Sequence, residues 1–154
     1  IDPGIVLHLL RQEKLTVDQL DSVLSRRSGL AALGAGNGDM RAVLALEPAR
    51  AEAALAHYAM QIRKSVGAAI AVLGGVDAIS VGGGVGEHQP VVRQAVFAGL
   101  DDLGIVLDAE RNRHAEGHAA LHANLHAKES VVALWLCPVD EMDEMWRQYT
   151  VLDC

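Results

Sequence analysis

Four glycines lie close together in the segment VGGGVGEHQP, residues 81–90. They follow an apolar run at residues 77–81, which predicts a short strand, and they precede Pro90, which is typical of the first turn of a helix. Ordering glycine costs more backbone entropy than ordering other residues, so the cluster indicates that the main chain itself is needed there. Between a strand and a helix, glycines let a ligand reach main-chain N–H groups, and the helix dipole favours negative charge. The segment is therefore a candidate cradle for a phosphate and a sugar.

The spacing of these glycines differs from two well-known phosphate-binding motifs. The sixth position counted from Gly82 or Gly84 is not glycine, whereas the dinucleotide fingerprint requires one. No Gly-Lys-Ser or Gly-Lys-Thr closes the segment, as it would in a P-loop. A tight turn that lets a strand and a helix pack closely would use the same glycines. The segment by itself leaves both interpretations open.

A second pattern that could bind a ligand is a run of histidines at four-residue spacing. Its members are His114, His118, His122 and His126. On one helix this spacing would align four imidazoles, which could bind zinc or nickel. Gly117 and Asn124 weaken a helix here, and no cysteine or carboxylate completes an evident ligand set. The run therefore favours a solvated, variable surface, with a metal-binding domain as the alternative.

Hydrophobic periodicity and end signals predict a mainly helical chain with short strands. The longest helix, residues 48–73, keeps its apolar spacing until Gly74 and Gly75, which are typical of a helix C-cap. Thr16 and Gln19 predict a capping box at the start of an earlier helix. The remaining predicted elements are helices at residues 3–14, 39–47, 90–100 and 140–149, strands at residues 78–81, 104–108 and 130–137, and a passage of small residues at 28–38.

Composition favours one well-buried α/β domain, or part of one. The chain has 154 residues, of which 51% are hydrophobic, and this is enough for a single core. One Phe, two Trp and two Tyr are its aromatic residues, so the core must consist of Ala, Leu, Val and Ile, which pack closely in helices and parallel strands. Cys137 lies in an apolar run and is predicted to be a buried thiol in a reducing compartment.

Charge and hydropathy exclude several classes of partner. The chain has 20 acidic and 13 basic residues, for a formal charge of −7, and no basic stripe with interleaved aromatics, so nucleic acid is not an expected partner. The longest mostly apolar run, residues 66–76, is well short of the ~20 residues that span a bilayer, so no membrane partner is expected. The N-terminal residues predict an amphipathic helix rather than a signal peptide. A cytoplasmic protein is expected.

Read together, four segments resemble the C-terminal portion of acetate kinases, in the acetate/propionate kinase family of the actin-like sugar-kinase superfamily. They are residues 1–4 (IDPG), residues 28–30 with 38–41 (SGL and GDMR), residues 82–87 (GGGVGE) and residues 138–141 (PVDE), and they occur in the family's order. The intervening segments at residues 62–68 and 99–105 are also similar. The resemblance extends over residues 1–150 as a nucleotide-binding portion, with residues 151–154 as a tail.

This resemblance implies a fold class and an activity. The fold implied is α/β, the C-terminal part of an actin-like (ribonuclease H-like) ATPase domain, helix-rich with a small mixed sheet. The activity implied is reversible transfer of the γ-phosphoryl group of ATP to acetate, propionate or a similar short-chain carboxylate, with ATP/ADP and Mg²⁺ as cofactors. Members of the family pair through this domain, so a homodimer is expected, with the helix at residues 48–73 contributing to its interface.

The resemblance also implies site residues. The glycine segment would lie against adenosine and the α-phosphate, and Glu141 would lie beside Mg²⁺, which prefers oxygen ligands. The nucleotide-binding residues implied are Asp39, Met40, Arg41, Gly83, Gly84, Val85, Gly86 and His88. Without the resemblance, Asp39 and Arg41 would be interpreted as a helix cap and a surface ion pair, and Glu141 as an acid that complements a helix dipole.

The chain departs from the family pattern at several points. His88 stands where the family usually has Asn, and Met142 replaces a second acid beside Glu141. The family's substrate-binding arginine, phosphate loop and catalytic histidine precede the segment that matches Ile1. We therefore expect no catalytic residue within residues 1–154 and no activity from this segment alone. A stand-alone nucleotide-binding module and a structural, dimerising segment are the alternatives.

Overall fold

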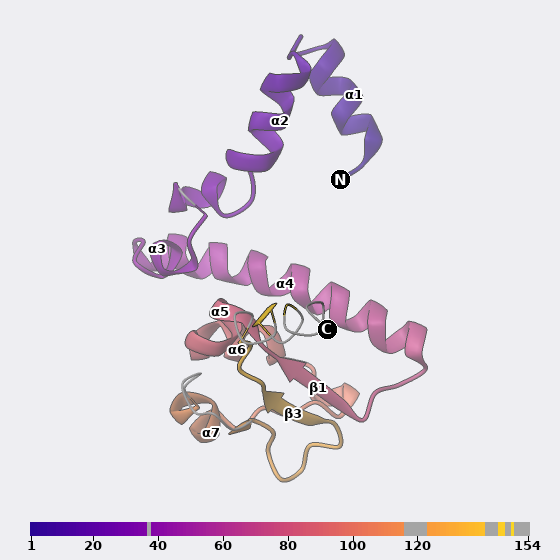
Figure 1. Cartoon of the computed structure of the whole chain (residues 1–154), viewed down its shortest axis with the longest axis vertical. Helices are drawn as coiled ribbons and strands as arrows, with labels where there is room; N and C mark the ends of the chain where they lie inside the picture. The colour runs from indigo at the N-terminus through magenta and orange to yellow at the C-terminus, as the bar shows by residue number, and fades with distance from the viewer. Residues whose placement is uncertain (37, 116–122, 141–144, 147–148, 150–154) are drawn as a thin grey trace. The chain divides into compact units, whose positions relative to one another are not determined.

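The computed structural model describes the whole chain except residues 37, 116–122, 141–144, 147–148 and 150–154. It consists of two compact units, Ile1–Tyr58 and Ala59–Cys154, which are described separately below (Figure 1). Within the described ranges, none of the helices is long and apolar enough to cross a membrane.

The regular elements described in the first unit are all helices. Helix α1 (Pro3–Arg11) begins after Asp2, whose Oδ1 accepts a hydrogen bond from the Gly4 N–H at 2.6 Å. Helix α2 (Val17–Arg26) begins with the predicted capping box, because Thr16 Oγ1 accepts from Gln19 N at 3.2 Å and Gln19 Oε1 accepts from Thr16 N at 2.8 Å. One helical turn, η1 (Ala31–Ala35), and helix α3 (Met40–Leu44) follow. Buried side chains of the unit include Leu20, Met40, Val43 and Ala54.

The longest helix, α4 (Pro48–Leu73), contains 26 residues and contributes to both units. Its bounds match the predicted ones. The helix ends where Gly74 adopts a left-handed conformation with φ +74° and Gly75 N donates to Ile70 O at 3.0 Å. A positive φ is available to glycine without steric cost, so the Gly-Gly pair ends the helix as the sequence predicts.

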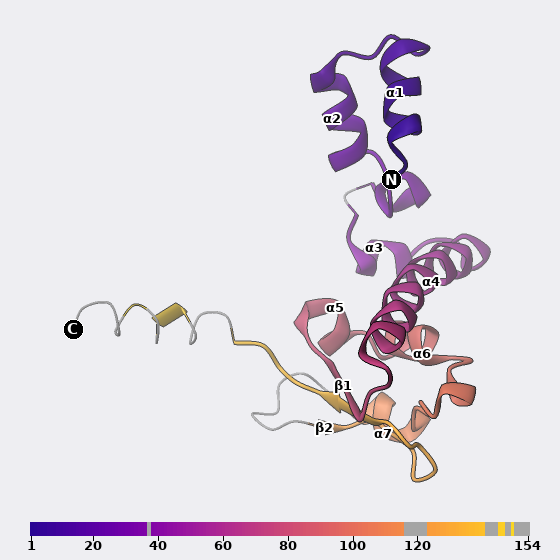
Figure 2. The same ribbon diagram turned by 90° about the vertical axis from the view of Figure 1, so that its right-hand side faces the viewer.

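The second unit contains a small mixed sheet in the order β1-β3-β2. Strands β1 and β3 are labelled in Figure 1, and β1 and β2 in Figure 2. Strands β1 (Ala78–Val81) and β3 (Ala133–Leu136) are parallel, with Ala78 opposite Ala133 and Val81 opposite Leu136. The short strand β2 (Ala123–Asn124) pairs antiparallel with β3. The helix-rich fold with a small mixed sheet is therefore confirmed.

Four short helical elements of the second unit lie between β1 and β2 in the chain. They are α5 (Gly83–His88), α6 (Pro90–Phe97), the 3₁₀ turn η2 (Asp101–Leu103) and α7 (Ala109–His114). The helix predicted to reach residue 100 ends earlier, at Phe97, because Ala98 with ψ 128° and then Gly99 with φ +75° leave the helical conformation. The unit is built around buried apolar side chains from β3, α6 and the segments beside them, including Val92, Val96, Phe97, Ile105, Leu125, Leu134 and Leu136.

Several predicted elements differ in the structure. The strand predicted at residues 104–108 is wrong: its main chain makes an isolated bridge from Leu107 to His126, and Gly104 O instead accepts from Val131 N and Val132 N, each at 2.9 Å. Cys137 is half-buried rather than buried, because it follows the last residue of β3. The helix predicted at residues 140–149 lies largely outside the described residues.

Candidate functional site

The glycine segment, for which the sequence predicted no regular element, is helical. Gly82 is the extended N-cap residue, and Gly83, Gly84 and Gly86 lie within α5. We call Gly82 together with α5 the glycine turn. It joins the end of β1 to the start of α6, where Pro90 occupies the first turn as predicted. Glycine has a low helix propensity, so contacts from elsewhere in the unit must stabilise this short helix.

Three of the four glycines are required by the fold itself. A Cβ on Gly82 would lie 2.9 Å from Cys137 O and 2.9 Å from Val139 Cγ2, and a Cβ on Gly86 would lie 2.9 Å from Val81 Cγ1. All three distances are shorter than real Cβ contacts allow. Gly83 has φ +76°, a conformation that side chains of L-residues strain. Close packing, one of the two sequence interpretations, therefore explains Gly82 and Gly86, and the backbone conformation explains Gly83.

Gly84 is different from the other three. A Cβ there would meet no described atom within 4 Å, and Gly84 is absent from the glycines with positive φ. It lies exposed within α5, where alanine would be the favoured residue on helix propensity alone. Neither packing against the described residues nor backbone conformation accounts for glycine at this position.

The carboxylate of Glu87 binds two main-chain groups that are far apart in the sequence. Its Oε1 accepts from Gly83 N at 2.8 Å and from Val139 N at 3.0 Å, and the residue is only 7% exposed. The first bond satisfies a donor at the start of α5, and the second ties α5 to the chain that follows β3. Glu87 was not selected from the sequence as a site residue, although its position four residues after Gly83 could have indicated a contact across one helical turn.

Arg93 holds the other end of the same helix and is also deeply buried, with 2% exposure. Its guanidinium donates to Gly86 O at 2.7 Å and Glu87 O at 2.9 Å, near the end of α5. It also donates to Asn112 O at 2.6 Å and Ala115 O at 3.1 Å, at the end of α7, and to Asn112 Oδ1 at 2.6 Å. Burial lowers the pKa of this guanidinium. One cation thus complements the carbonyl ends of two helices.

The sequence contained a signal for Arg93 that was not used. Helical spacing places residue 93 on the same face as Val92, Val96 and Phe97, and all four side chains are buried. A charged residue on the apolar face of a helix requires polar partners in the interior. The partners themselves could not be predicted, because Asn112 lies 19 residues away.

The predicted adenosine-side residues lie in the first unit, at the start of α3. Asp39 is the N-cap, with its Oδ1 accepting from Arg41 N at 2.8 Å, and its Oδ2 forms an ion pair with Arg41 Nη2 at 2.8 Å. Hydrogen bonds from the Arg41 side chain and then from its main-chain N–H hold the pKa of the Asp39 carboxyl below its usual value. Both the cap and the surface ion pair are therefore present, with 80% of the Arg41 side chain exposed.

The remaining predicted site residues have different environments. Met40 is 3% exposed, so its side chain belongs to the core of the first unit and a ligand could reach only its main chain. Val85 is half-buried and His88 is exposed. Glu141, the predicted magnesium ligand, lies outside the described residues. Contact of any of these residues with a nucleotide or metal stays a prediction.

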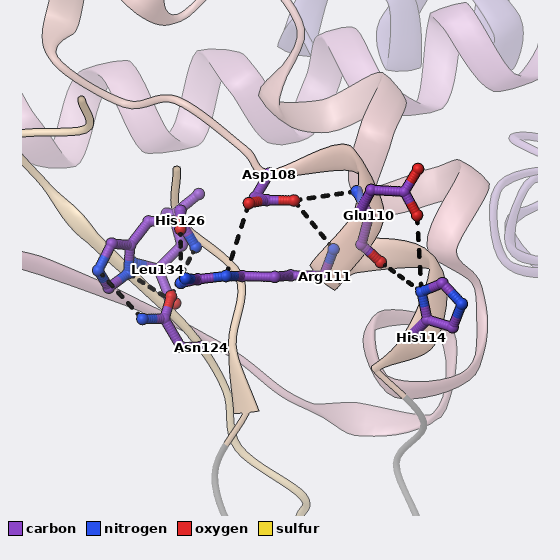
Figure 3. A network of polar contacts seen from close by, with 7 residues as sticks. All are labelled: Asp108, Glu110, Arg111, His114, Asn124, His126 and Leu134. Carbon is purple, nitrogen blue, oxygen red and sulfur yellow. Dashed lines mark hydrogen bonds and ion pairs between the residues drawn. The ribbon is translucent and has the colours of Figure 1, made fainter. Parts of the chain in front are cut away.

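The first and last histidines of the run, His114 and His126, do not lie on one helix. His114 is the last residue of α7, and Ala115 is extended, while His118 and His122 lie outside the described residues. His114 and His126 therefore belong to separate segments, as Figure 3 shows. Among the described residues, no group of three or more His, Cys, Asp or Glu side chains could hold a metal ion.

His126 is not a solvated surface residue, and this corrects the sequence interpretation. It is half-buried, its Nδ1 accepts a hydrogen bond from Leu134 N at 3.0 Å, and its ring packs edge-on against Trp135 with centroids 5.8 Å apart. Its own N–H donates to Asn124 Oδ1 at 2.9 Å, and its carbonyl accepts from Arg111 Nη1 at 3.2 Å (Figure 3). The side chain thus completes the edge of the sheet beside β3.

Comparison with known proteins supports the resemblance found in the sequence. The Acetokinase family matches residues 1–144. The acetate kinase of Clavibacter michiganensis subsp. michiganensis is 43% identical over 151 residues, which cover 96% of this chain and 37% of that protein. The acetate kinase of Sulfurovum sp. is 36% identical over 156 aligned residues, which cover 99% of this chain and 38% of that protein. The chain thus spans less than two-fifths of the length of these curated relatives.

Solved structures give the same result for the fold. The chain is similar to the crystal structure of Porphyromonas gingivalis acetate kinase, with a TM-score of 0.85 and 29% identity over 99% of this chain and 38% of that chain. A propionate kinase from Francisella tularensis has the same fold, with a TM-score of 0.78 and 24% identity over 92% of this chain and 35% of that chain. The expected fold class is confirmed, and the chain belongs to the acetokinase family.

Proposed function

We propose that this chain supplies the nucleotide-side part of a kinase that transfers the γ-phosphoryl group of ATP, reversibly, to acetate or another short-chain carboxylate such as propionate. Two findings support the proposal. The family match extends over residues 1–144, and the relatives and solved structures described above are named acetate kinases, with a propionate kinase among the structures.

The single observation that carries the nucleotide role is the glycine at position 84. Its three neighbours Gly82, Gly83 and Gly86 are explained by packing or backbone conformation, whereas Gly84 lies exposed in a helix with no described atom near its missing Cβ. A ligand that lies against the main chain would account for it, because any side chain would occupy the space of the ligand. Adenosine and the α-phosphate of ATP are the groups that the family resemblance assigns to this surface.

The other residues of the chain would bind and orient the nucleotide. Arg41, with its highly exposed guanidinium, would contact the adenosine side together with Asp39, and the main chain of Met40 would complete that segment. Val85 and His88 would flank the surface at Gly84. Phosphoryl transfer depends mainly on positioning and on charge around the phosphates, so these residues would act by placing the nucleotide, and none of them is assigned a chemical step.

The residues also fit a magnesium ion. The acids Asp140 and Glu141 follow directly after Val139, and carboxylates are hard oxygen ligands of the kind that Mg²⁺ prefers, usually one or two with several waters. Glu141 would hold the ion. When bound, Mg²⁺ supplies positive charge that neutralises the phosphates during transfer.

The homodimer and the cytoplasmic location that the resemblance implies are part of the same proposal. Sedimentation velocity on the 154-residue chain measures self-association directly. A compact species with the 16.3 kDa mass of one chain at all concentrations would contradict the homodimer.

Transfer to a carboxylate is tested in a chimera. Residues 1–144 of this chain replace the matching segment of the Clavibacter acetate kinase, which is 43% identical to it. With Mg-ATP and acetate or propionate, the chimera is expected to form acyl phosphate, trapped as the hydroxamate. The matched control is the same chimera carrying Gly84→Val, which is expected to lose activity. A folded chimera that forms no acyl phosphate would contradict the proposal.

A structural or dimerising segment is the competing interpretation. It predicts that the chain self-associates but does not bind ATP. Equilibrium titration of the chain with ATP separates the two, because only the nucleotide-binding interpretation predicts saturable binding.

A further inference from the structure

We propose that Glu87 is a positioning residue for the glycine turn: its buried carboxylate fixes α5 to the main chain that follows β3 and so determines where Gly84 stands. This inference rests on the proposed function, because it takes the surface at Gly84 as the nucleotide surface. Glu87 itself would not touch the nucleotide, since it is 7% exposed and its Oε1 is bound to the protein main chain.

One oxygen atom makes both of the bonds that carry the proposal. Glu87 Oε1 accepts from Gly83 N at 2.8 Å and from Val139 N at 3.0 Å. Both are within normal hydrogen-bond length, and a charged acceptor makes such bonds stronger than neutral ones. Because the two donors share one acceptor, the start of α5 and residue 139 cannot move apart without breaking at least one bond to a buried carboxylate.

The two segments that Glu87 joins are also in close steric contact. A Cβ on Gly82 would lie 2.9 Å from both Cys137 O and Val139 Cγ2, so the glycine turn packs directly against this stretch. Attraction through Glu87 and repulsion at Gly82 together define the distance between them. The position of the turn is therefore fixed by contacts, and not by its own glycine-rich helix, which has little intrinsic stability.

Arg93 restrains the opposite end of α5. It donates to Gly86 O and Glu87 O, and Gly84 lies between these carbonyls and the Gly83 N–H that Glu87 binds. The turn is thus held at its first N–H by an anion and at its last carbonyls by a cation, both favourable to the helix dipole. Arg93 joins α5 to α7, whereas Glu87 joins it to the chain after β3.

The chemistry of the contact predicts which substitutions preserve it. Glutamine has nearly the same length, and its carbonyl oxygen can accept both N–H groups, so Glu87→Gln keeps the geometry without the charge. Alanine removes the acceptor from two N–H groups at a partly buried contact, which is unfavourable. Glu52, an exposed acid on α4, provides the matched control, Glu52→Ala.

Amide hydrogen exchange of the full 154-residue chain, followed by NMR, tests the contact without any ligand. We expect the Gly83 and Val139 amides to be protected in the wild-type chain, in Glu87→Gln and in Glu52→Ala. In Glu87→Ala both should exchange faster by about tenfold or more, as lost hydrogen bonds to a charged group predict. Unchanged exchange at either amide in a folded Glu87→Ala, or a folded Glu87→Gln in which both amides exchange freely, would overturn the proposal.

Titration with ATP tests the consequence for binding. Glu87→Ala is expected to bind ATP about tenfold or more weakly than the wild-type chain, and Glu87→Gln is expected to restore binding to within about threefold, since a displaced binding surface costs affinity and a restored one regains it. Equal affinities for wild type and a folded Glu87→Ala would overturn the positioning role. Failure of the wild-type chain to bind ATP would instead contradict the proposed function, and the exchange experiment would still decide whether Glu87 holds the turn.

Discussion

Arg93 and Asn112 are joined through both oxygens of the asparagine: the Arg93 guanidinium donates to Asn112 Oδ1 and to Asn112 O, each at 2.6 Å. The asparagine amide in turn donates to Pro90 O at 2.9 Å, and both residues are almost fully buried. This pair connects α6 to α7 and, through the other bonds of Arg93, to the end of the glycine turn. The polar centre of the second unit is therefore a cation surrounded by carbonyl groups.

Removing this cation should strongly destabilise the second unit. Arg93→Met retains much of the side-chain volume but leaves several buried carbonyls without a donor, so we expect a loss of about 3 kcal/mol in the free energy of unfolding. Urea denaturation measures it. Arg113→Met, which removes an exposed arginine from α7, is the control and should change stability by less than about 0.5 kcal/mol. Equal effects of the two substitutions would contradict this assignment.

The two helical glycines at positions 84 and 86 should respond in opposite directions to alanine. Gly86→Ala places a Cβ 2.9 Å from Val81 Cγ1 and should destabilise the chain by about 1–3 kcal/mol. Gly84→Ala adds a Cβ in open space and should be neutral or stabilise by up to about 1 kcal/mol, because alanine favours helix. Combining Gly86→Ala with Val81→Ala should recover part of the loss. The same sign of change at both glycines would contradict the packing described here.

The ion pair of Asp39 with Arg41 predicts a pH dependence of stability in the first unit. Because the folded-state pKa of Asp39 is lowered, its contribution is present above the unfolded-state pKa of about 3.9 and is lost as the pH falls through the lower folded-state pKa. Asp39→Asn keeps a capping oxygen but removes the charge. The difference in stability between wild type and Asp39→Asn should be larger near about pH 6 than near about pH 2.5, measured by thermal unfolding. A difference that is independent of pH would rule out the ion pair as its source.

Substitution of His126 should destabilise the sheet, whereas substitution of His114 should not. His126→Phe keeps a ring beside Trp135 but removes the acceptor for Leu134 N, so we expect a loss of about 1–2 kcal/mol. His114 has a largely exposed side chain, and His114→Ala should change stability by less than about 0.5 kcal/mol. Titration with Zn²⁺ should leave the unfolding midpoint unchanged. If Zn²⁺ raised the unfolding midpoint and both substitutions abolished this effect, the result would favour the metal-binding alternative.

The parts of the fold that the sequence predicted correctly are those that depend on local signals. The capping box of Thr16 and Gln19, the long helix α4 with its Gly74 end, and the strand β1 are each determined by residues within a few positions of one another. Local propensity and periodicity are sufficient for such elements.

The elements that were predicted wrongly depend on contacts between distant residues. Glycines disfavour helix, yet α5 forms because Glu87 and Arg93 bind its two ends. Residues 104–108 have the composition of a strand, but the hydrogen-bonding capacity of Gly104 is taken by Val131 and Val132. Neither outcome can be predicted from the spacing of residues along the chain.

In the candidate site too, local signals could be predicted and contacts between distant residues could not. Its residues were assigned by resemblance to a family, and the structure adds a physical reason for only some of them: Gly83 by its φ, and Gly86 by its contact with Val81. The role of Glu87 could not be predicted from the glycine segment alone, because its partner Val139 is 52 residues away.

The central claim, that Gly84 is glycine because a nucleotide lies against it, is tested most directly by comparing two substitutions. Gly84→Val and Gly67→Val both replace a glycine that lies in a helix without a positive φ and with no described atom within 4 Å of the added Cβ. Their intrinsic costs to the helix should therefore be similar. The measurement is the dissociation constant for ATP of the wild-type chain and of both variants, with folding checked by circular dichroism.

We predict saturable ATP binding by the wild-type chain, the same affinity within about threefold for Gly67→Val, and a loss of about tenfold or more for Gly84→Val, as expected when a side chain occupies ligand space. Equal ATP affinities for the two folded variants, or no binding by the wild-type chain, would contradict the account.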